Sequence, residues 1–210
     1  GLDRQAGMGK VVRHPLIDGH RPVFRPLMER AEARVSGLLK VRSHSDGPSR
    51  TPLEPLEQKL GISLNEGQRA AVQMALSHRV CVITGGPGTG KTTIVKVLLA
   101  AATLRMERWE LAAPTGRAAR RLSESCGQQA RTLHRMLEWS PQVGGFTRDP
   151  TNPLETEGVL IDEASMLDLN LVDAVVSALP PKARLVLVGD VDQLPSVGPG
   201  QVLRDLIDSG

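Results

Sequence analysis

Hydrophobic positions repeat with two different periods along the chain, and these periods predict its elements. From residue 64 onward, short apolar runs typical of strands alternate with stretches in which apolar residues have helical spacing. Strands are expected at 80–84, 111–113, 159–161 and 185–188, and helices at 66–77, 92–102, 117–125, 133–137, 170–179 and from about 202. Apolar strands separated by helices indicate an α/β fold with a parallel sheet that helices cover on both faces.

The first 60 residues follow a different pattern. Over 24–42, apolar residues at helical spacing predict an amphipathic helix whose stripe needs a covering surface: Leu27, Met28, Ala31, Val35, Leu38 and Leu39. Pro, Gly and Ser then interrupt every period, which predicts a linker. We therefore divide the chain into the end of an N-terminal helical region (1–42), a linker (43–60) and an α/β domain (61–210) with a hairpin insertion at about 138–157.

Charge is distributed unevenly over the 210 residues, whose net charge is +3. Residues 1–50 hold 10 Lys and Arg against 5 Asp and Glu, whereas the remaining residues hold 16 against 18. Residues 105–135 are a local exception, with seven arginines against three acids. This stretch is a candidate surface for phosphates, although charge alone favours a solvated helix face. Aromatic residues make up 2%, so few side chains are available to stack on bases.

Composition also excludes several classes of protein. Two cysteines cannot form a disulfide framework, and no Cys and His cluster has metal-site spacing. No apolar run approaches the roughly 18 residues of a membrane span, and the first residues lack the apolar core of a signal peptide. We therefore expect a cytoplasmic protein without a membrane partner.

Residues 85–92, GGPGTGKT, match the phosphate-binding pattern G-x-x-x-x-G-K-[ST] between a predicted strand and a predicted helix. The glycines allow backbone N–H groups to converge on an anion, and the helix N-terminus adds about half a positive charge. Lys91 is expected to reach the β and γ phosphates, and Thr92 to ligate Mg²⁺. The expected cofactors are ATP and Mg²⁺, and the expected contacts in this P-loop are Gly85, Gly86, Pro87, Gly88, Thr89, Gly90, Lys91, Thr92 and Thr93.

A second strand ends in two acids, Asp162 and Glu163. Asp162 is expected to hold Mg²⁺ through water, and Glu163 to orient and deprotonate the attacking water. Asp followed by Glu favours a motor-type ATPase over a GTPase. Gln193 follows a third strand, where an amide can contact the γ phosphate, but ordinary loop polarity explains it about as well. The expected catalytic set is Lys91, Asp162, Glu163 and Gln193.

Six segments in a fixed order resemble the first RecA-like motor domain of superfamily 1 DNA helicases, and most closely the RecD-like branch that includes the exonuclease V alpha subunit. They are 65–68 (NEGQ), 85–92, 113–119 (APTGRAA), 132–137 (TLHRML), 162–166 (DEASM) and 189–198 (GDVDQLPSVG). The resemblance implies a P-loop NTPase with a RecA-like fold. It also implies ATP-driven 5′ to 3′ translocation on single-stranded DNA and duplex unwinding in DNA repair and recombination.

The same resemblance assigns roles to individual residues. It implies that Gln68 contacts adenine. It implies DNA contacts by Pro114, Thr115, Gly116, Arg117, Thr132, His134 and Arg135. The insertion lies where relatives carry a pin at the duplex junction, with Trp139 and Phe146 as apolar sides, although a simple surface hairpin is an equally good interpretation. The helix at 24–42 resembles the end of the region before the motor, and its stripe is then a docking face.

The resemblance also names partners. In these helicases ATP lies between two RecA-like domains, and the second supplies an arginine finger worth about 10³ to 10⁵ in rate. We therefore expect the 210 residues alone to bind ATP and Mg²⁺, to hydrolyse ATP slowly and not to translocate. The expected partners are single-stranded DNA, a duplex junction, a second RecA-like domain of the same protein, and nuclease or repair subunits. Two alternatives remain: a P-loop ATPase of another output, such as an AAA-type remodeller, and a nucleotide-dependent interaction module.

Overall fold

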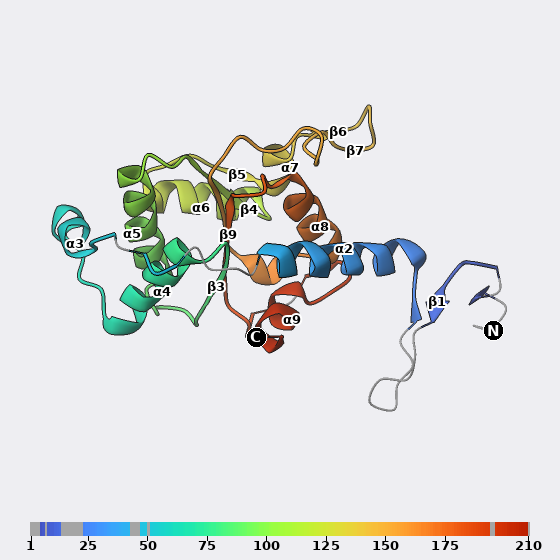
Figure 1. The fold of residues 1–210 in the computed structure, drawn as a ribbon, viewed down its shortest axis with the longest axis horizontal. Helices are drawn as coiled ribbons and strands as arrows, with labels where there is room; N and C mark the ends of the chain where they lie inside the picture. The colour runs from blue at the N-terminus through green and yellow to red at the C-terminus, as the bar shows by residue number, and fades with distance from the viewer. Residues whose placement is uncertain are drawn as a thin grey trace.

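The computed structural model describes residues 5–6, 8–13, 23–42, 47–49, 51–193 and 196–209. Its centre is a five-stranded sheet with strand order β3-β9-β8-β4-β5 (Figure 1). Every neighbouring pair is parallel, so the carboxyl ends of all five strands meet at one edge. The predicted α/β fold is confirmed. The strands are β3 Val80–Thr84, β4 Trp109–Ala113, β5 Ala130–Thr132, β8 Gly158–Ile161 and β9 Arg184–Gly189.

Helices cover both faces of this sheet (Figure 1). Alternate strand residues face opposite sides: in β9, Leu185 and Leu187 belong to one core cluster and Val186 and Val188 to the other. The first cluster includes residues of α2 Pro26–Arg42, α7 Leu133–Met136, α8 Leu169–Ala178 and α9 Val202–Asp208. The second includes residues of α3 Glu54–Leu60, α4 Glu66–Ser77, α5 Lys91–Leu104 and α6 Gly116–Cys126.

In the second core cluster, a large aromatic side chain occupies the space that a glycine leaves open on the neighbouring strand. Trp109, 4% exposed, is the register partner of Gly158 on the neighbouring strand. A Cβ atom at position 158 would lie 2.4 Å from the indole ring, so only glycine leaves room for it. The indole N–H donates to the Glu107 carboxylate at 3.0 Å, which satisfies its one polar atom.

The predicted docking of the N-terminal helix is confirmed, because α2 packs against α8. Val35 and Leu39 are buried in the same cluster as Val172, Val175 and Val176 of α8. Arg42, 7% exposed, donates to the carbonyls of Leu179 at 2.7 Å and Pro180 at 2.8 Å, just beyond the end of α8. Leu27 was predicted in the apolar stripe, but it is 73% exposed and lies outside this contact.

The predicted linker over 43–60 is wrong for its last part. Residues 54–60 form α3, which contacts α5 and buries Leu56 in the core. A proline in the first turn favours the start of this helix, and Gly61 ends it in a left-handed conformation, with φ 63°. Residues 47–49 and 51–52 have no regular structure, and 43–46 and 50 lie outside the described residues.

Smaller elements complete the fold. The insertion forms an antiparallel hairpin, β6 Trp139–Ser140 and β7 Gly145–Phe146, which projects from the sheet layer (Figure 1). Strand β5 was not predicted; it pairs with β4 over three residues. Near the N-terminus, β1 Val12–Arg13 pairs with β2 Val23–Phe24. Within the described residues, no helix has the length and apolar character needed to span a bilayer.

Candidate nucleotide site and nucleic-acid face

The P-loop joins the end of β3 to the start of α5, and its backbone is tightly folded. The Thr89 hydroxyl donates to the Gly86 carbonyl at 2.9 Å and closes the turn. A Cβ atom at Gly85 would lie 2.8 Å from that hydroxyl oxygen. Gly88 and Gly90 have φ values of 78° and 85°, a region that residues with a side chain rarely adopt. The loop geometry itself therefore favours glycine at positions 85, 88 and 90.

Lys91 is the first residue of α5, and its side chain turns back over the loop. Its ammonium donates to the carbonyls of Gly85 and Gly86, the second at 2.9 Å. The N-terminus of α5 carries a partial positive charge of its own. A polyphosphate attracted to this helix end would therefore meet the Lys91 charge beside the N–H groups of the loop.

Gln68 connects α4 to the P-loop. Asn65 and Gln68 form a capping box: the Asn65 side chain accepts from the Gln68 N–H at 2.8 Å, and the Gln68 side chain accepts from the Asn65 N–H at 3.1 Å. The Gln68 amide nitrogen also donates to the Thr89 carbonyl at 3.0 Å. Residues of α4, β3 and the P-loop, Gln68 and Lys91 among them, line a cavity of about 410 Å³. The structure thus brings the predicted Gln68 to the predicted phosphate loop.

The two predicted acids follow β8, which is separated from the P-loop strand by β9. Burial raises the pKa of Asp162, while the Glu163 N–H, at 2.9 Å from its carboxylate, and the Lys91 charge act in the opposite direction. Lys91 and Asp162 therefore belong to one electrostatic site. Glu163 has φ 55° and ψ 40°, a left-handed conformation that is uncommon for a residue with a side chain. Such backbone strain concentrates at functional sites.

The donor chemistry at this edge fits Mg²⁺. This ion usually takes one or two carboxylates and completes its shell with phosphate oxygens and water. Thr92 is exposed at the start of α5, and one carboxylate oxygen of Asp162 makes no hydrogen bond within the described part of the chain. Across the described residues, no group of three or more His, Cys, Asp or Glu could hold a metal without a ligand's help.

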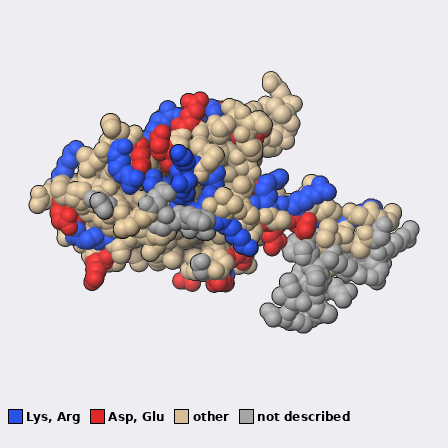
Figure 2. Space-filling model, viewed as in Figure 1, with Lys and Arg blue, Asp and Glu red and all other residues tan. Residues whose placement is uncertain are grey.

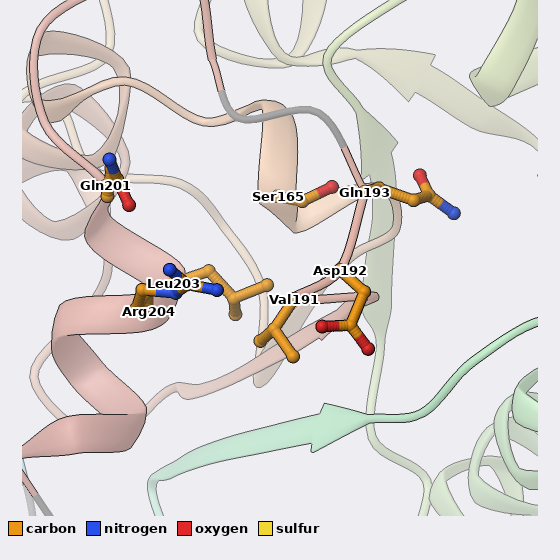
Figure 3. A pocket seen from close by; sticks show the side chains of 7 residues that line it. All are labelled: Ser165, Val191, Asp192, Gln193, Gln201, Leu203 and Arg204. Carbon is orange, nitrogen blue, oxygen red and sulfur yellow. The ribbon is translucent and has the colours of Figure 1, made fainter.

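The loop after β9 carries Gln193. Its N–H donates to the Asp190 carbonyl at 3.3 Å, and Asp190 is 4% exposed. Gln193 lines a cavity of about 300 Å³ between this loop and α9, together with Ser165 and Arg204 (Figure 3). The Ser165 hydroxyl is buried there without a partner among the described residues, a feature that the sequence pattern did not reveal. Leu194 and Pro195 of the predicted segment 189–198 lie outside the described residues.

The two predicted DNA segments each begin a helix at the same edge of the sheet. Thr115 follows β4 and accepts from the Ala118 N–H at 3.2 Å, which caps α6. Thr132 ends β5 and accepts from the Arg135 N–H at 3.2 Å, which caps α7. Since β4 and β5 are adjacent and parallel, the two helix N-termini lie on neighbouring strands. Helix N-termini favour phosphate, so this pair is a candidate backbone-binding surface.

The seven arginines of 105–135 divide into two groups. Four form ion pairs with nearby acids: Arg105, Arg108, Arg120 and Arg131. The other three, Arg117, Arg121 and Arg135, have no side-chain hydrogen bond or ion pair with any residue that the structure describes. On the face drawn in Figure 2, basic and acidic side chains are interspersed and form no continuous basic surface. The unpaired arginines are therefore the better candidates for phosphate contacts. Arg121 among them was predicted only as part of the basic stretch, not among the DNA contacts that the resemblance implies.

The hairpin is joined to α7 through aromatic contacts. Trp139 and Phe146 face each other across the two strands with ring centroids 5.1 Å apart, and His134 of α7 lies 5.6 Å from Phe146. At the base, the Glu138 carboxylate accepts from Arg148 at 2.8 Å and from the Thr147 hydroxyl at 2.9 Å. Trp139 remains 49% exposed. The predicted DNA residue His134 is thus in contact with the hairpin.

Comparison with known proteins identifies the family. A model described as an AAA domain matches residues 68–199, well over half of the chain. The chain belongs to this family of AAA domains. Its match begins at Gln68 and ends just after the Gln193 loop, so it contains the whole nucleotide site described above.

Curated relatives of this AAA domain carry RecD names. The chain is 37% identical over 191 residues to the ATP-dependent RecD2 DNA helicase of Deinococcus radiodurans, covering 90% of the chain and 26% of that protein. It is 44% identical over 164 residues to the RecBCD enzyme subunit RecD of Mycobacterium tuberculosis, covering 67% and 28%. The RecD-like resemblance is confirmed. The chain spans roughly a quarter of the length of these relatives.

A solved structure of two coordinating Pif1 helicases at forked DNA has the same fold as this AAA domain. The TM-score is 0.51 at 23% identity, over 70% of this chain and 38% of that one. The agreement supports the α/β fold of the parallel sheet and its covering helices.

Proposed function

We propose that this chain is the ATP-binding motor domain of an ATP-dependent DNA helicase of RecD type. The observation that carries the proposal is the shared sheet edge. The P-loop, the acids after β8 and the capped helices α6 and α7 all follow the carboxyl ends of parallel strands. Ligands of open α/β sheets bind at this edge. A nucleotide site and a phosphate-binding surface are therefore built on one rigid element.

Each residue of the nucleotide site has a distinct task in hydrolysis. Loop N–H groups and the Lys91 ammonium bind the β and γ phosphates and stabilise the charge that develops on them. Thr92 and Asp162 would hold Mg²⁺, which neutralises phosphate charge when it is bound. Glu163 accepts a proton from the attacking water as general base. Its strained backbone, fixed by the adjacent buried strand, sets the direction of its side chain.

Gln193 and the proposed DNA-binding surface at α6 and α7 would couple ATP hydrolysis to movement along DNA. Strand β9 lies between the strands that carry the P-loop and the acids, so a change at the γ phosphate can be transmitted to the Gln193 loop. Single-stranded DNA would lie across the N-termini of α6 and α7, near Arg117, His134 and Arg135. On the family resemblance alone, we further propose 5′ to 3′ movement and unwinding at a duplex junction next to the hairpin. The proposed partners are a second RecA-like domain of the same protein and repair subunits.

The direct test is ATP hydrolysis by the chain with and without single-stranded DNA. A helicase motor domain is expected to bind ATP and Mg²⁺ and to respond to DNA with increased, though slow, turnover. An AAA-type remodeller would bind and hydrolyse ATP with no response to DNA. An interaction module would bind ATP without turnover under either condition, and either of these results would refute the proposal.

A further inference from the structure

Ser165 places a buried hydroxyl close to the proposed general base. It lies in a short 3₁₀ helix, η1 Ala164–Met166, which begins directly after Glu163. The Ser165 Oγ atom is almost inaccessible to solvent and has no hydrogen-bond partner within the described part of the chain. An unpaired buried hydroxyl costs free energy, and such atoms are few in folded proteins, so this one calls for an explanation.

The 3₁₀ helix is packed against the end of β9 and against α9. Gly189 is the last residue of β9, and a Cβ atom there would lie 3.2 Å from the Ser165 backbone nitrogen and 2.8 Å from a methyl group of Leu203 in α9. Glycine at this position therefore lets β9 lie close to the 3₁₀ helix. The turn that carries Glu163 is thus in contact with the strand whose following loop carries Gln193.

Ser165 and Gln193 line the same cavity of about 300 Å³ (Figure 3). In this view the Ser165 hydroxyl points toward the Gln193 loop, whereas the Gln193 amide is turned away from Ser165. Gln193 is exposed, and its amide makes no hydrogen bond with any residue that the structure describes. The cavity leaves room for this amide to turn inward, where its oxygen can accept a hydrogen bond from the hydroxyl.

We propose that Ser165 is a positioning residue for ATP hydrolysis: its hydroxyl donates to the Gln193 amide oxygen and so directs the amide nitrogen toward the γ phosphate. This inference rests on the proposed nucleotide site. A glutamine amide presents a donor at one end and an acceptor at the other, and only the donor end attracts a phosphate. Because Ser165 follows Glu163 by two residues, the same hydrogen bond ties the Gln193 loop to the turn that carries the general base.

The first experiment separates binding from hydrolysis in Ser165→Ala. Affinities for ATP and ADP are measured by calorimetry with excess Mg²⁺, and hydrolysis is measured in a single turnover with the chain in excess over ATP. The variant is expected to hydrolyse ATP about 3- to 10-fold more slowly, the effect of one ordinary hydrogen bond. Its ADP affinity should be unchanged, because ADP has no γ phosphate. Ser165→Thr keeps the hydroxyl and should hydrolyse ATP at close to the original rate.

Thermal unfolding separates positioning from a purely structural role. Removal of an unpaired buried hydroxyl should leave the Tm of Ser165→Ala unchanged or raise it, whereas removal of a hydroxyl that stabilises the fold would lower the Tm. Scanning calorimetry without nucleotide makes this comparison. Slower hydrolysis together with a lower Tm, and without recovery in Ser165→Thr, would assign Ser165 to the fold and overturn the inference.

A double-mutant cycle tests the partner of the hydroxyl. If Ser165 acts through Gln193, the double variant should be no slower than Gln193→Ala alone, since the interaction is already lost. Arg204→Ala changes another wall of the same cavity and is the control: its effect on the rate should multiply with that of Ser165→Ala. If Gln193→Ala hydrolyses ATP too slowly to measure, the ratio of ATP to ADP affinity replaces the rate in the cycle.

Three results would overturn the inference: normal hydrolysis by Ser165→Ala, normal hydrolysis by Gln193→Ala, or effects of these two variants that simply multiply. Lys91→Ala, titrated in parallel, tests the underlying site. Loss of ATP binding in Lys91→Ala together with normal hydrolysis by Ser165→Ala refutes the inference alone, whereas normal ATP binding by Lys91→Ala refutes the proposed nucleotide site.

Discussion

The Arg34 side chain of α2 pairs with Asp173 of α8, with 2.6 Å between the guanidinium Nε and a carboxylate oxygen. The Arg34 side chain is 56% exposed and that of Asp173 14%, so the pair itself contributes little stability. Together with buried Arg42 and the apolar contacts of Val35 and Leu39, however, it shows that α2 is packed as part of the motor domain. A helix that the sequence divides from the α/β domain is structurally continuous with it.

Arg42→Ala should therefore destabilise the whole domain. It leaves the carbonyls of Leu179 and Pro180 without their charged donor in a buried place, which costs about 2–3 kcal/mol in the free energy of unfolding. Urea unfolding followed by circular dichroism measures this loss. Arg30→Ala, on the exposed part of the same helix, is the matched control and should change stability by less than about 0.5 kcal/mol. Equal effects of the two variants would show that α2 is not docked as described.

Asp162→Asn should make the chain more stable and less active at neutral pH. Because the pKa of Asp162 is raised by burial, the folded chain holds its proton more tightly than the unfolded chain does. The free energy of unfolding therefore falls as the pH rises from the ordinary range of an aspartate through the raised pKa, and the loss is complete above that pKa. Asparagine removes this cost, so the Tm at pH 7 should increase.

The same variant should lose Mg²⁺-dependent hydrolysis. In the unchanged chain, Mg²⁺-dependent ATP affinity should decline as the pH is lowered through the raised pKa, since a protonated Asp162 cannot hold the ion. Scanning calorimetry and ATP titrations at several pH values measure both effects. A lower Tm for Asp162→Asn at pH 7 would argue that the carboxylate is stabilised, not strained, by its surroundings.

Arg117→Ala and Arg135→Ala should each weaken binding of single-stranded DNA and reduce the slope of log affinity against log salt by about 0.7, as for one lost phosphate contact. Arg120→Ala is the control, because Arg120 already pairs with Glu124 on the same stretch of chain. Fluorescence anisotropy of a labelled oligonucleotide at several salt concentrations gives the slopes. If all three variants behave alike, the division between paired and unpaired arginines has no bearing on DNA binding.

Tryptophan fluorescence can test whether the hairpin meets DNA at a duplex junction, because the chain has two tryptophans in different environments. Trp109 is buried and Trp139 is 49% exposed, so a change in emission upon DNA binding should come from Trp139. A forked duplex should alter this emission more than a single strand of equal length, because the hairpin projects from the body of the domain. Trp139→Phe should abolish the change and leave Trp109 emission as a constant background. An identical response to both DNAs would favour a simple surface hairpin.

Segments with a strong hydrophobic pattern predicted most of the sheet and the site. Elements with a weak pattern were not predicted, for identifiable reasons. Strands β3, β8 and β9 are continuous apolar runs, and the P-loop and the acids follow them directly. Strand β5 is three residues long and centred on Arg131, so its sequence lacks an apolar strand pattern. Its strand conformation depends on its pairing with β4. Helix α3 was not predicted because a proline is as typical of a linker as of a helix start; in the structure Pro55 and Gly61 mark its start and end.

The capping box of Asn65 and Gln68 follows from their spacing, but side-chain partners that are distant in the sequence could not be predicted. Which arginines of 105–135 are paired depends on acids as distant as Glu155. The contact from Gln68 to the Thr89 carbonyl spans 21 residues, and it required the packing of α4 beside the P-loop. The burial of the Ser165 hydroxyl likewise depends on the packing of α9 beside residues 164–166, which are distant in the sequence.

The most direct measurement of the central claim is ATP binding and single-strand-dependent turnover of two variants beside the unchanged chain. Lys91→Ala should lose ATP binding, and with it turnover, because the charge over the loop is gone. Glu163→Gln should bind ATP and Mg²⁺ as tightly as the original and fail to hydrolyse ATP, since an amide cannot accept the proton of the attacking water. Undiminished turnover by Glu163→Gln, with or without DNA, would contradict the assignment of this edge of the sheet as the catalytic site.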